Sequence, residues 1–141
     1  MRKNFSWLEF TLNILWHIFP YIKDQPKLVA VVTNDQGHER YLEFLIDTGA
    51  DYTFISYSHA ILLGLDYHSI QSPEKDFDVA NSTSIKAKKI YLTIKIGNKN
   101  ILTPVFIANQ PMENLLGRRG IFDHYEIVFQ ESKKQVIFTE V

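Results

Sequence analysis

The sequence predicts a mainly β protein, a small closed β-barrel with one or two short helices in its main domain and a helix at the N-terminus. Three observations lead to this fold class. Short runs of β-branched and aromatic residues recur at regular spacing, residues typical of turns separate them, and few segments carry helical signals. The length of 141 residues suits one compact domain with a single core.

The segment at residues 5–22 is predicted to be an amphipathic helix. On a helical wheel its polar residues fall in one narrow sector, and nearly every other position is apolar. Glu9, Asn13 and His17 interrupt the apolar run and no small-residue cleavage site follows, so neither a signal peptide nor a spanning helix fits. We expect the apolar face to pack against its own domain or a sister subunit, with contact to a membrane surface as the alternative.

Two prolines, at positions 20 and 26, mark the entry to the main domain. We therefore divide the chain into an N-terminal helical extension at residues 1–25 and a main domain at residues 26–141. We expect a cytoplasmic protein, with peripheral membrane association through residues 5–22 as the alternative.

From residue 27 onward the pattern is that of strands joined by tight turns. Asn34–Gly37 has turn chemistry between the first two strands, and Gly97-Asn98 joins a later pair. Ser56 is predicted to cap a short helix that ends at Gly64. The strands are expected, in order, at residues 28–33, 41–46, 52–55, 85–96, 101–107, 126–129 and 135–138, with a brief helical piece at 119–124.

The composition excludes several kinds of function. Fifteen basic and sixteen acidic residues leave a net charge of -1, so there is no global basic field to attract nucleic acid. The chain has no cysteine, which rules out disulfides, thiolate zinc sites and a cysteine nucleophile. The five histidines are scattered without the spacing of metal ligands. We therefore expect no metal, no cofactor and no nucleic-acid partner.

The segment at residues 44–55 carries the most informative chemistry. An apolar strand stops at Asp47 and is followed at once by Thr48 and Gly49, which places one carboxylate at the lip of a hydrophobic barrel. The plain alternative is a tight surface turn, since all three residues favour turns. Apolar residues before the motif and a half-buried strand after it favour the first interpretation.

The stretch FLIDTGADYTFIS resembles the active-site corner of the retropepsin-like aspartic proteases. Asn114-Leu115-Leu116-Gly117-Arg118 is similar to their second motif, two apolar residues followed by Gly and Arg before a short helix. The likeness is strongest to single-domain bacterial and archaeal members, and it covers residues 26–141. It implies a retropepsin-like fold, with a flap hairpin between the two motifs.

The resemblance also implies an activity, hydrolysis of peptide bonds in a peptide or protein substrate. That chemistry needs two aspartates that share one proton, and the sequence has a single Asp-Thr-Gly, so the second copy must come from a homodimer. The implied catalytic residues are Asp47, Thr48 and Gly49. Substrate-binding residues would be Ala50, Asp51, Asn81 and Ser82, and Leu116, Gly117 and Arg118 would support the site.

Further roles follow from the same likeness. Thr48 would bond to its counterpart across the dimer axis, and Asp51 would form a buried bidentate ion pair with Arg118 as well as hold the substrate backbone. Residues 135–141 could seal the dimer as a terminal strand.

The predicted flap departs from the family pattern because its tip, residues 79–85, has no glycine. Lys86, Lys88, Lys89 and Lys95 flank it. They alternate with apolar residues and are expected on the solvent face of a strand, with an anionic partner as the alternative.

Two other functions stay open from the sequence. One is a catalytically idle retropepsin-like domain that dimerises or binds peptides, since a fold does not dictate a function. The other is a membrane-surface protein anchored by its N-terminal helix.

Overall fold

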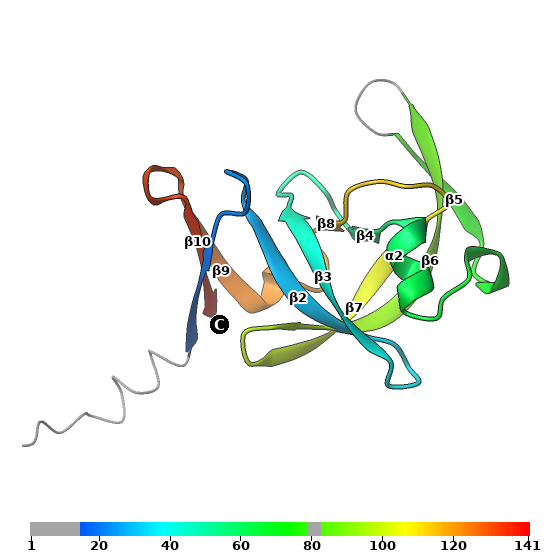
Figure 1. The fold of residues 1–141 in the computed structure, drawn as a ribbon, viewed down its shortest axis with the longest axis horizontal. Helices are drawn as coiled ribbons and strands as arrows, with labels where there is room; N and C mark the ends of the chain where they lie inside the picture. The colour runs from blue at the N-terminus through cyan, green and yellow to red at the C-terminus, as the bar shows by residue number, and fades with distance from the viewer. Residues whose placement is uncertain (1–14, 79–82) are drawn as a thin grey trace, which may run out of the picture.

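The computed structural model describes residues 15–78 and 83–141, and it is mainly β as predicted. The strands form two sheets, one of seven strands and one of three (Figure 1). The three-stranded sheet lies at one side of the molecule, and the β5–β6 hairpin projects at the other. These pairings describe two sheets, in place of the single closed barrel that the sequence suggested.

The seven-stranded sheet has the order β2-β3-β8-β4-β7-β6-β5, and β2 also pairs with β6. Its strands fall where the alternating runs of the sequence predict them, with the exception of β5. Their bounds are β2 Lys27–Thr33, β3 Glu39–Ile46, β4 Thr53–Ile55, β5 Glu74–Asp78, β6 Ser84–Ile96, β7 Lys99–Ala108 and β8 Leu115–Leu116.

The three-stranded sheet has the order β1-β10-β9, with all neighbours antiparallel. Its strands are β1 Trp16–Pro20, β9 Tyr125–Gln130 and β10 Gln135–Glu140. β10 therefore has a strand of its own chain on each edge. This arrangement brings the N-terminal part of the described chain beside its C-terminal part.

The predicted N-terminal helix is wrong where it can be checked, because residues 16–20 form β1. These residues satisfy their main-chain groups by pairing with β10, and Phe19 packs edge-on against Phe138 with ring centroids 5.4 Å apart. The rest of the predicted helix, residues 5–14, lies outside the described residues. The domain division at residue 25 stays a prediction, although β1 on one side of it pairs with β10 on the other.

The short helix α2 (Tyr57–Leu62) is confirmed. The hydroxyl of Ser56 accepts the N–H of His59, which is the N-cap bond that the sequence predicts. A 3₁₀ turn at Phe122–His124 lies within the predicted helical piece at 119–124.

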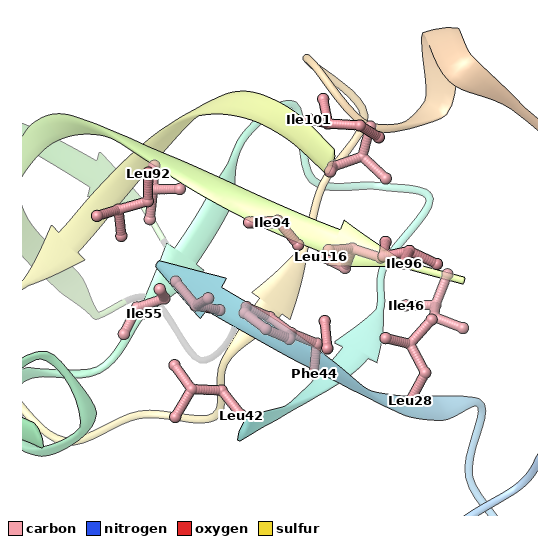
Figure 2. Packing of buried hydrophobic residues seen from close by; sticks show 14 of the residues in the cluster. Leu28, Leu42, Phe44, Ile46, Ile55, Leu92, Ile94, Ile96, Ile101 and Leu116 are labelled. Atoms are coloured by element: carbon pink, nitrogen blue, oxygen red, sulfur yellow. The ribbon is translucent and has the colours of Figure 1, made fainter. Parts of the chain in front are cut away.

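Buried residues form two hydrophobic clusters. The larger one lies between the curved strands of the seven-stranded sheet, where Phe44 of β3 and Leu28 of β2 face Ile94 and Ile96 of β6 (Figure 2). The smaller cluster lies at the base of the β5–β6 hairpin; its buried members are Phe54, Ile85, Ala87, Phe106 and Ala108. Asp47 follows β3, a strand of the larger cluster, while β4, which follows Asp47, supplies the smaller one.

No helix in residues 15–78 or 83–141 is long and apolar enough to cross a membrane.

Candidate active site

Asp47 follows directly on β3, where the buried strand reaches the surface. Its side chain is half-buried, whereas Thr48 and Gly49 beside it are exposed. The N–H of Gly49 donates to Asp47 Oδ1 over 2.9 Å, and the N–H of Ala50 donates to the Asp47 carbonyl over 3.2 Å. The tight turn thus orients one carboxylate at the edge of the protein core, as the sequence predicts.

The corner after Asp47 is braced by the second motif through main-chain hydrogen bonds. The N–H of Asp47 donates to the Leu116 carbonyl over 3.0 Å. The N–H groups of Arg118 and Arg119 donate to the carbonyls of Ala50 and Asp51 over 2.9 and 2.8 Å. Because these bonds join backbone to backbone, the position of the carboxylate depends on the chain path and little on neighbouring side chains.

Gly117 makes this close approach possible. A Cβ atom at this position would lie 2.1 Å from the Tyr52 carbonyl oxygen, a distance that no side-chain rotation could relieve. The N–H of Gly117 donates to the hydroxyl of Thr53, which is fully buried. The glycine of the second motif is therefore required by the backbone of the first.

Asn114 is a second buried brace, and sequence reasoning assigned it no role. Its side-chain oxygen accepts the N–H of Ser56 over 2.9 Å and lies 3.1 Å from the His59 ring. Its side-chain nitrogen donates to the Glu43 carbonyl over 3.1 Å. One buried amide therefore ties β3, the start of α2 and the second motif together.

Asp51 and Arg118 form the predicted pair, but its character is different. One guanidinium nitrogen of Arg118 lies 3.6 Å from Asp51 Oδ1, and the two side chains are 59% and 68% exposed. In the single chain it is an exposed, single contact, so the expected buried bidentate pair is wrong. An exposed pair of this kind contributes little to stability because water screens it.

A hollow of about 280 Å³ lies beside this pair. It is lined by Asp51, Arg118, Arg119, Phe122 and Asp123. The corner and the short turn after the second motif therefore enclose polar, charged space next to the predicted site.

An aromatic cluster adjoins the corner on its other side. Tyr52, Phe54, Phe77 and Phe106, which we call the aromatic cluster, have neighbouring ring centroids between 4.7 and 5.7 Å apart. Sequence reasoning missed it because its members come from four separate parts of the chain. Their pairing across β4, β5 and β7 brings them together.

The lysines near the hairpin divide between two faces. Lys86 pairs with Asp76 over 3.0 Å and Lys88 donates to the Tyr67 carbonyl, both on one face of β6. Lys89 lies on the other face, over the Tyr52 ring. A single solvent face for all the lysines is therefore wrong. The signal was in the numbering, since Lys89 shares odd parity with the buried Ile85 and Ala87.

An antiparallel hairpin is present where the flap was expected. Asp78 pairs with Ser84, so the connection between β5 and β6 falls within residues 79–83. Asn81 and Ser82, two predicted substrate-binding residues, lie outside the described residues. Among the residues that the structure describes, no group of three or more His, Asp or Glu side chains could hold a metal ion.

Comparisons with known proteins give this geometry a context. The family model described as gag-polyprotein putative aspartyl protease matches residues 34–119, more than half of the chain. No curated protein matches the sequence. The fold is similar to a retropepsin-like aspartic protease from Rickettsia conorii, with a TM-score of 0.66 and 20% identity over 86% of this chain and 97% of that one.

A further solved structure, the EIAV protease complexed with the inhibitor HBY-793, is similar with a TM-score of 0.49 and 20% identity, over 69% of this chain and 85% of that one. The matched residues 34–119 include both motifs, from Asp47 to Arg118. The predicted family is confirmed: the chain belongs to the retropepsin-like aspartyl proteases, in the gag-polyprotein putative aspartyl protease family.

Proposed function

We propose that the protein is an aspartic endopeptidase that hydrolyses peptide bonds as a homodimer, with a water molecule activated between the Asp47 residues of two chains. The observation that carries this proposal is the Asp47 carboxylate itself. It stands half-buried at the end of β3, it is oriented by the N–H of Gly49, and it is braced by the second motif through main-chain bonds.

The chemistry explains why one chain is not enough. Two carboxylates at hydrogen-bonding distance share one proton, because two like charges that close cannot both ionise. The ionised one takes a proton from water, and the protonated one polarises or protonates the carbonyl of the scissile bond. One chain offers one Asp-Thr-Gly, so a two-fold axis through the site supplies the second.

The neighbours of Asp47 take supporting roles in this proposal. Thr48 and Gly49 are exposed in the single chain, where a partner and a substrate could reach them. Ala50 and Asp51 would bind the substrate backbone, and Asn81 and Ser82 would do so from the hairpin connection. Leu116, Gly117 and Arg118 hold the corner in place.

The three-stranded sheet offers a surface for a second copy. Cross-strand pairing aligns Ile18 of β1, Ile137 of β10 and Val128 of β9 in one row, and Ile18 and Val128 are 54% and 40% exposed. Exposed apolar rows of this kind favour association. Residues 135–141 could not accept a partner strand directly, because β10 is already paired on both edges. A partner would instead cover the sheet face or extend β1 or β9.

The first test is Asp47→Asn in the full chain, assayed on a diverse peptide mixture by mass spectrometry. The amide has the same shape but can neither share the proton nor act as a base, so hydrolysis should be lost. Asp35→Asn is the matched control, because Asp35 lies in the other Asp-x-Gly turn and should keep full activity. Activity of Asp47→Asn within tenfold of the wild type would contradict the proposal.

A second test concerns the shared site. Activity per chain should fall on dilution, in step with dissociation followed by sedimentation velocity. Mixing the wild type with about a ninefold excess of Asp47→Asn chains should lower its activity to about a tenth, because most dimers then hold one competent carboxylate. Undiminished activity in a monomer would overturn the shared dyad while leaving Asp47 essential.

A cytoplasmic location remains part of the proposal. Its alternative, membrane contact through residues 5–22, predicts that the protein sediments with liposomes and that Trp16→Ser weakens this binding, since Trp16 is 53% exposed on β1. A protein that stays in the supernatant at all lipid concentrations would exclude that contact.

A further inference from the structure

Three cationic side chains converge on one aromatic ring beside the Asp47 corner. Lys75 Nζ, Lys89 Nζ and Arg119 Cζ lie 6.0, 5.7 and 5.3 Å from the centroid of the Tyr52 ring. Each distance falls within the range of a cation–π interaction. We call these three residues the cationic rim.

The cationic rim is assembled from three separate parts of the fold. Lys75 of β5 pairs with Ala87, and Lys89 of β6 pairs with Phe106 of β7, which places both lysines over the aromatic cluster. Arg119 follows the second motif, and its N–H donates to the Asp51 carbonyl. The same main-chain bonds that brace Asp47 therefore also position the rim.

The charges of the rim are not balanced by acids. Within residues 15–78 and 83–141, none of the ion pairs includes a member of the rim. Asp76, which neighbours Lys75 in β5, is paired with Lys86 on the opposite face, and Asp51 is paired with Arg118. Aromatic faces attract the cations, but they offer no lone pair as strong as a carboxylate to the N–H donors.

The consequence is a set of directed donors that gains most from an anion. Like charges held together repel one another, and an incoming carboxylate would relieve that repulsion while accepting several charge-assisted hydrogen bonds. The rim also lies at the substrate site. Tyr52 follows Asp51, and its carbonyl is packed against Gly117.

Resting on the proposed peptide hydrolysis, we propose that the cationic rim selects substrates with a glutamate or aspartate side chain close to the scissile bond. The carboxylate would accept hydrogen bonds from Lys75, Lys89 and Arg119, while the aromatic cluster packs against apolar atoms of the same peptide segment. The rim is then a specificity determinant and takes no part in bond cleavage.

The test compares matched peptides that differ by Glu against Gln at one position, scanned over four positions on each side of the cleaved bond. Their ends are acetylated and amidated, so the test position supplies the only carboxylate. At one position kcat/KM for Glu should exceed that for Gln by about fivefold or more, the effect of one well-placed ion pair. Added salt should reduce the ratio.

Variants connect this preference to the rim. Lys75→Gln combined with Lys89→Gln and Arg119→Gln should bring the Glu/Gln ratio close to one while the Gln peptide is cleaved as before. Lys89→Glu should favour a Lys peptide at the same position. Lys95→Gln is the matched control, because Lys95 is an exposed lysine of the same strand opposite Asn100, away from the rim, and its ratio should not change.

Binding separates this inference from the proposed function. Fluorescence anisotropy with labelled peptides and the Asp47→Asn protein reads the Glu preference without hydrolysis. If the wild type cleaves nothing but binding still prefers Glu through the rim, the protease proposal fails and the acidic site stands. Cleavage or binding that does not distinguish Glu from Gln at any position overturns the inference. So does displacement by a single-stranded oligonucleotide in the absence of any Glu preference.

Discussion

The Asp47 corner and the three-stranded sheet are held together in different ways. Main-chain hydrogen bonds to residues 114–119 fix the corner, and Gly117 lets the two backbones touch. β1 is held on one edge by β10, with Phe19 packed on Phe138 and His17 bonded to Glu140 over 2.7 Å. We expect the corner to fail at a few positions with large effects, and the terminal sheet to weaken in small steps.

The largest effect is expected for Gly117→Ala. Its Cβ would overlap the Tyr52 backbone, so the two motifs would have to separate, at a cost of about 4 kcal/mol or more in the free energy of unfolding. Gly37→Ala is a useful control, because nothing lies within 4 Å of its added Cβ and only its positive φ is strained, at about 1 kcal/mol. Urea unfolding measures both, and equal losses would contradict the bracing described above.

The next largest effect is expected for Asn114→Ala. The variant leaves the buried Ser56 N–H and the Glu43 carbonyl without their partner, which should cost about 3 kcal/mol. Because the amide braces the corner, kcat of the proposed hydrolysis should fall even at temperatures where the variant is folded. A variant that loses stability but keeps full kcat would limit Asn114 to packing.

Alkaline pH should weaken both regions through two buried tyrosines. Burial, and then the hydrogen bond to Glu74, raises the pKa of Tyr67 above its usual value, and burial with the nearby Glu140 charge raises the pKa of Tyr125. Above pH 10 the unfolded chain loses protons that the folded protein keeps, so the free energy of unfolding falls as pH rises. Each tyrosine contributes up to about 1.4 kcal/mol per pH unit.

The check is denaturant unfolding from pH 8 to pH 11 for the wild type, Tyr67→Phe and Tyr125→Phe. Each phenylalanine variant should lose less stability over this range than the wild type. Parallel pH profiles for all three proteins would show that other groups cause the alkaline loss.

The smallest effect is expected for His17→Ala. The variant removes a part-buried bond to Glu140 at one edge strand, which should cost about 1 kcal/mol and leave hydrolysis per dimer unchanged. Hydrogen exchange should show faster opening of β1 with no change around Asp47. Faster exchange at residues 114–119 as well would mean that the two regions are coupled.

The parts of the fold that the sequence predicts well are those that local chemistry specifies. The strand before Asp47, the turn that follows it, the Ser56 cap and the glycine of the second motif all need particular residue types at fixed positions. Each of them is found where it was expected.

The parts that the sequence did not predict depend on distant partners. The alternation in Trp16–Pro20 suits a strand as well as one side of a helix, and pairing with β10 decides between them. β5 has mostly charged residues and is a strand because β6 pairs with it. The exposure of Asp51 and the placement of Lys89 over Tyr52 follow from the path of the chain, which no motif encodes.

The order β1-β10-β9 also determines how the protein should come apart under force. Trp16 pairs with Thr139, so the start of β1 and the end of β10 lie at the same end of the sheet. A pull on these two ends would open the antiparallel ladder one pair at a time, from Trp16 toward Pro20, because its hydrogen bonds run across the strands. Single-molecule pulling should therefore show an early low-force step, in which β1 peels away while the Asp47 corner is still intact.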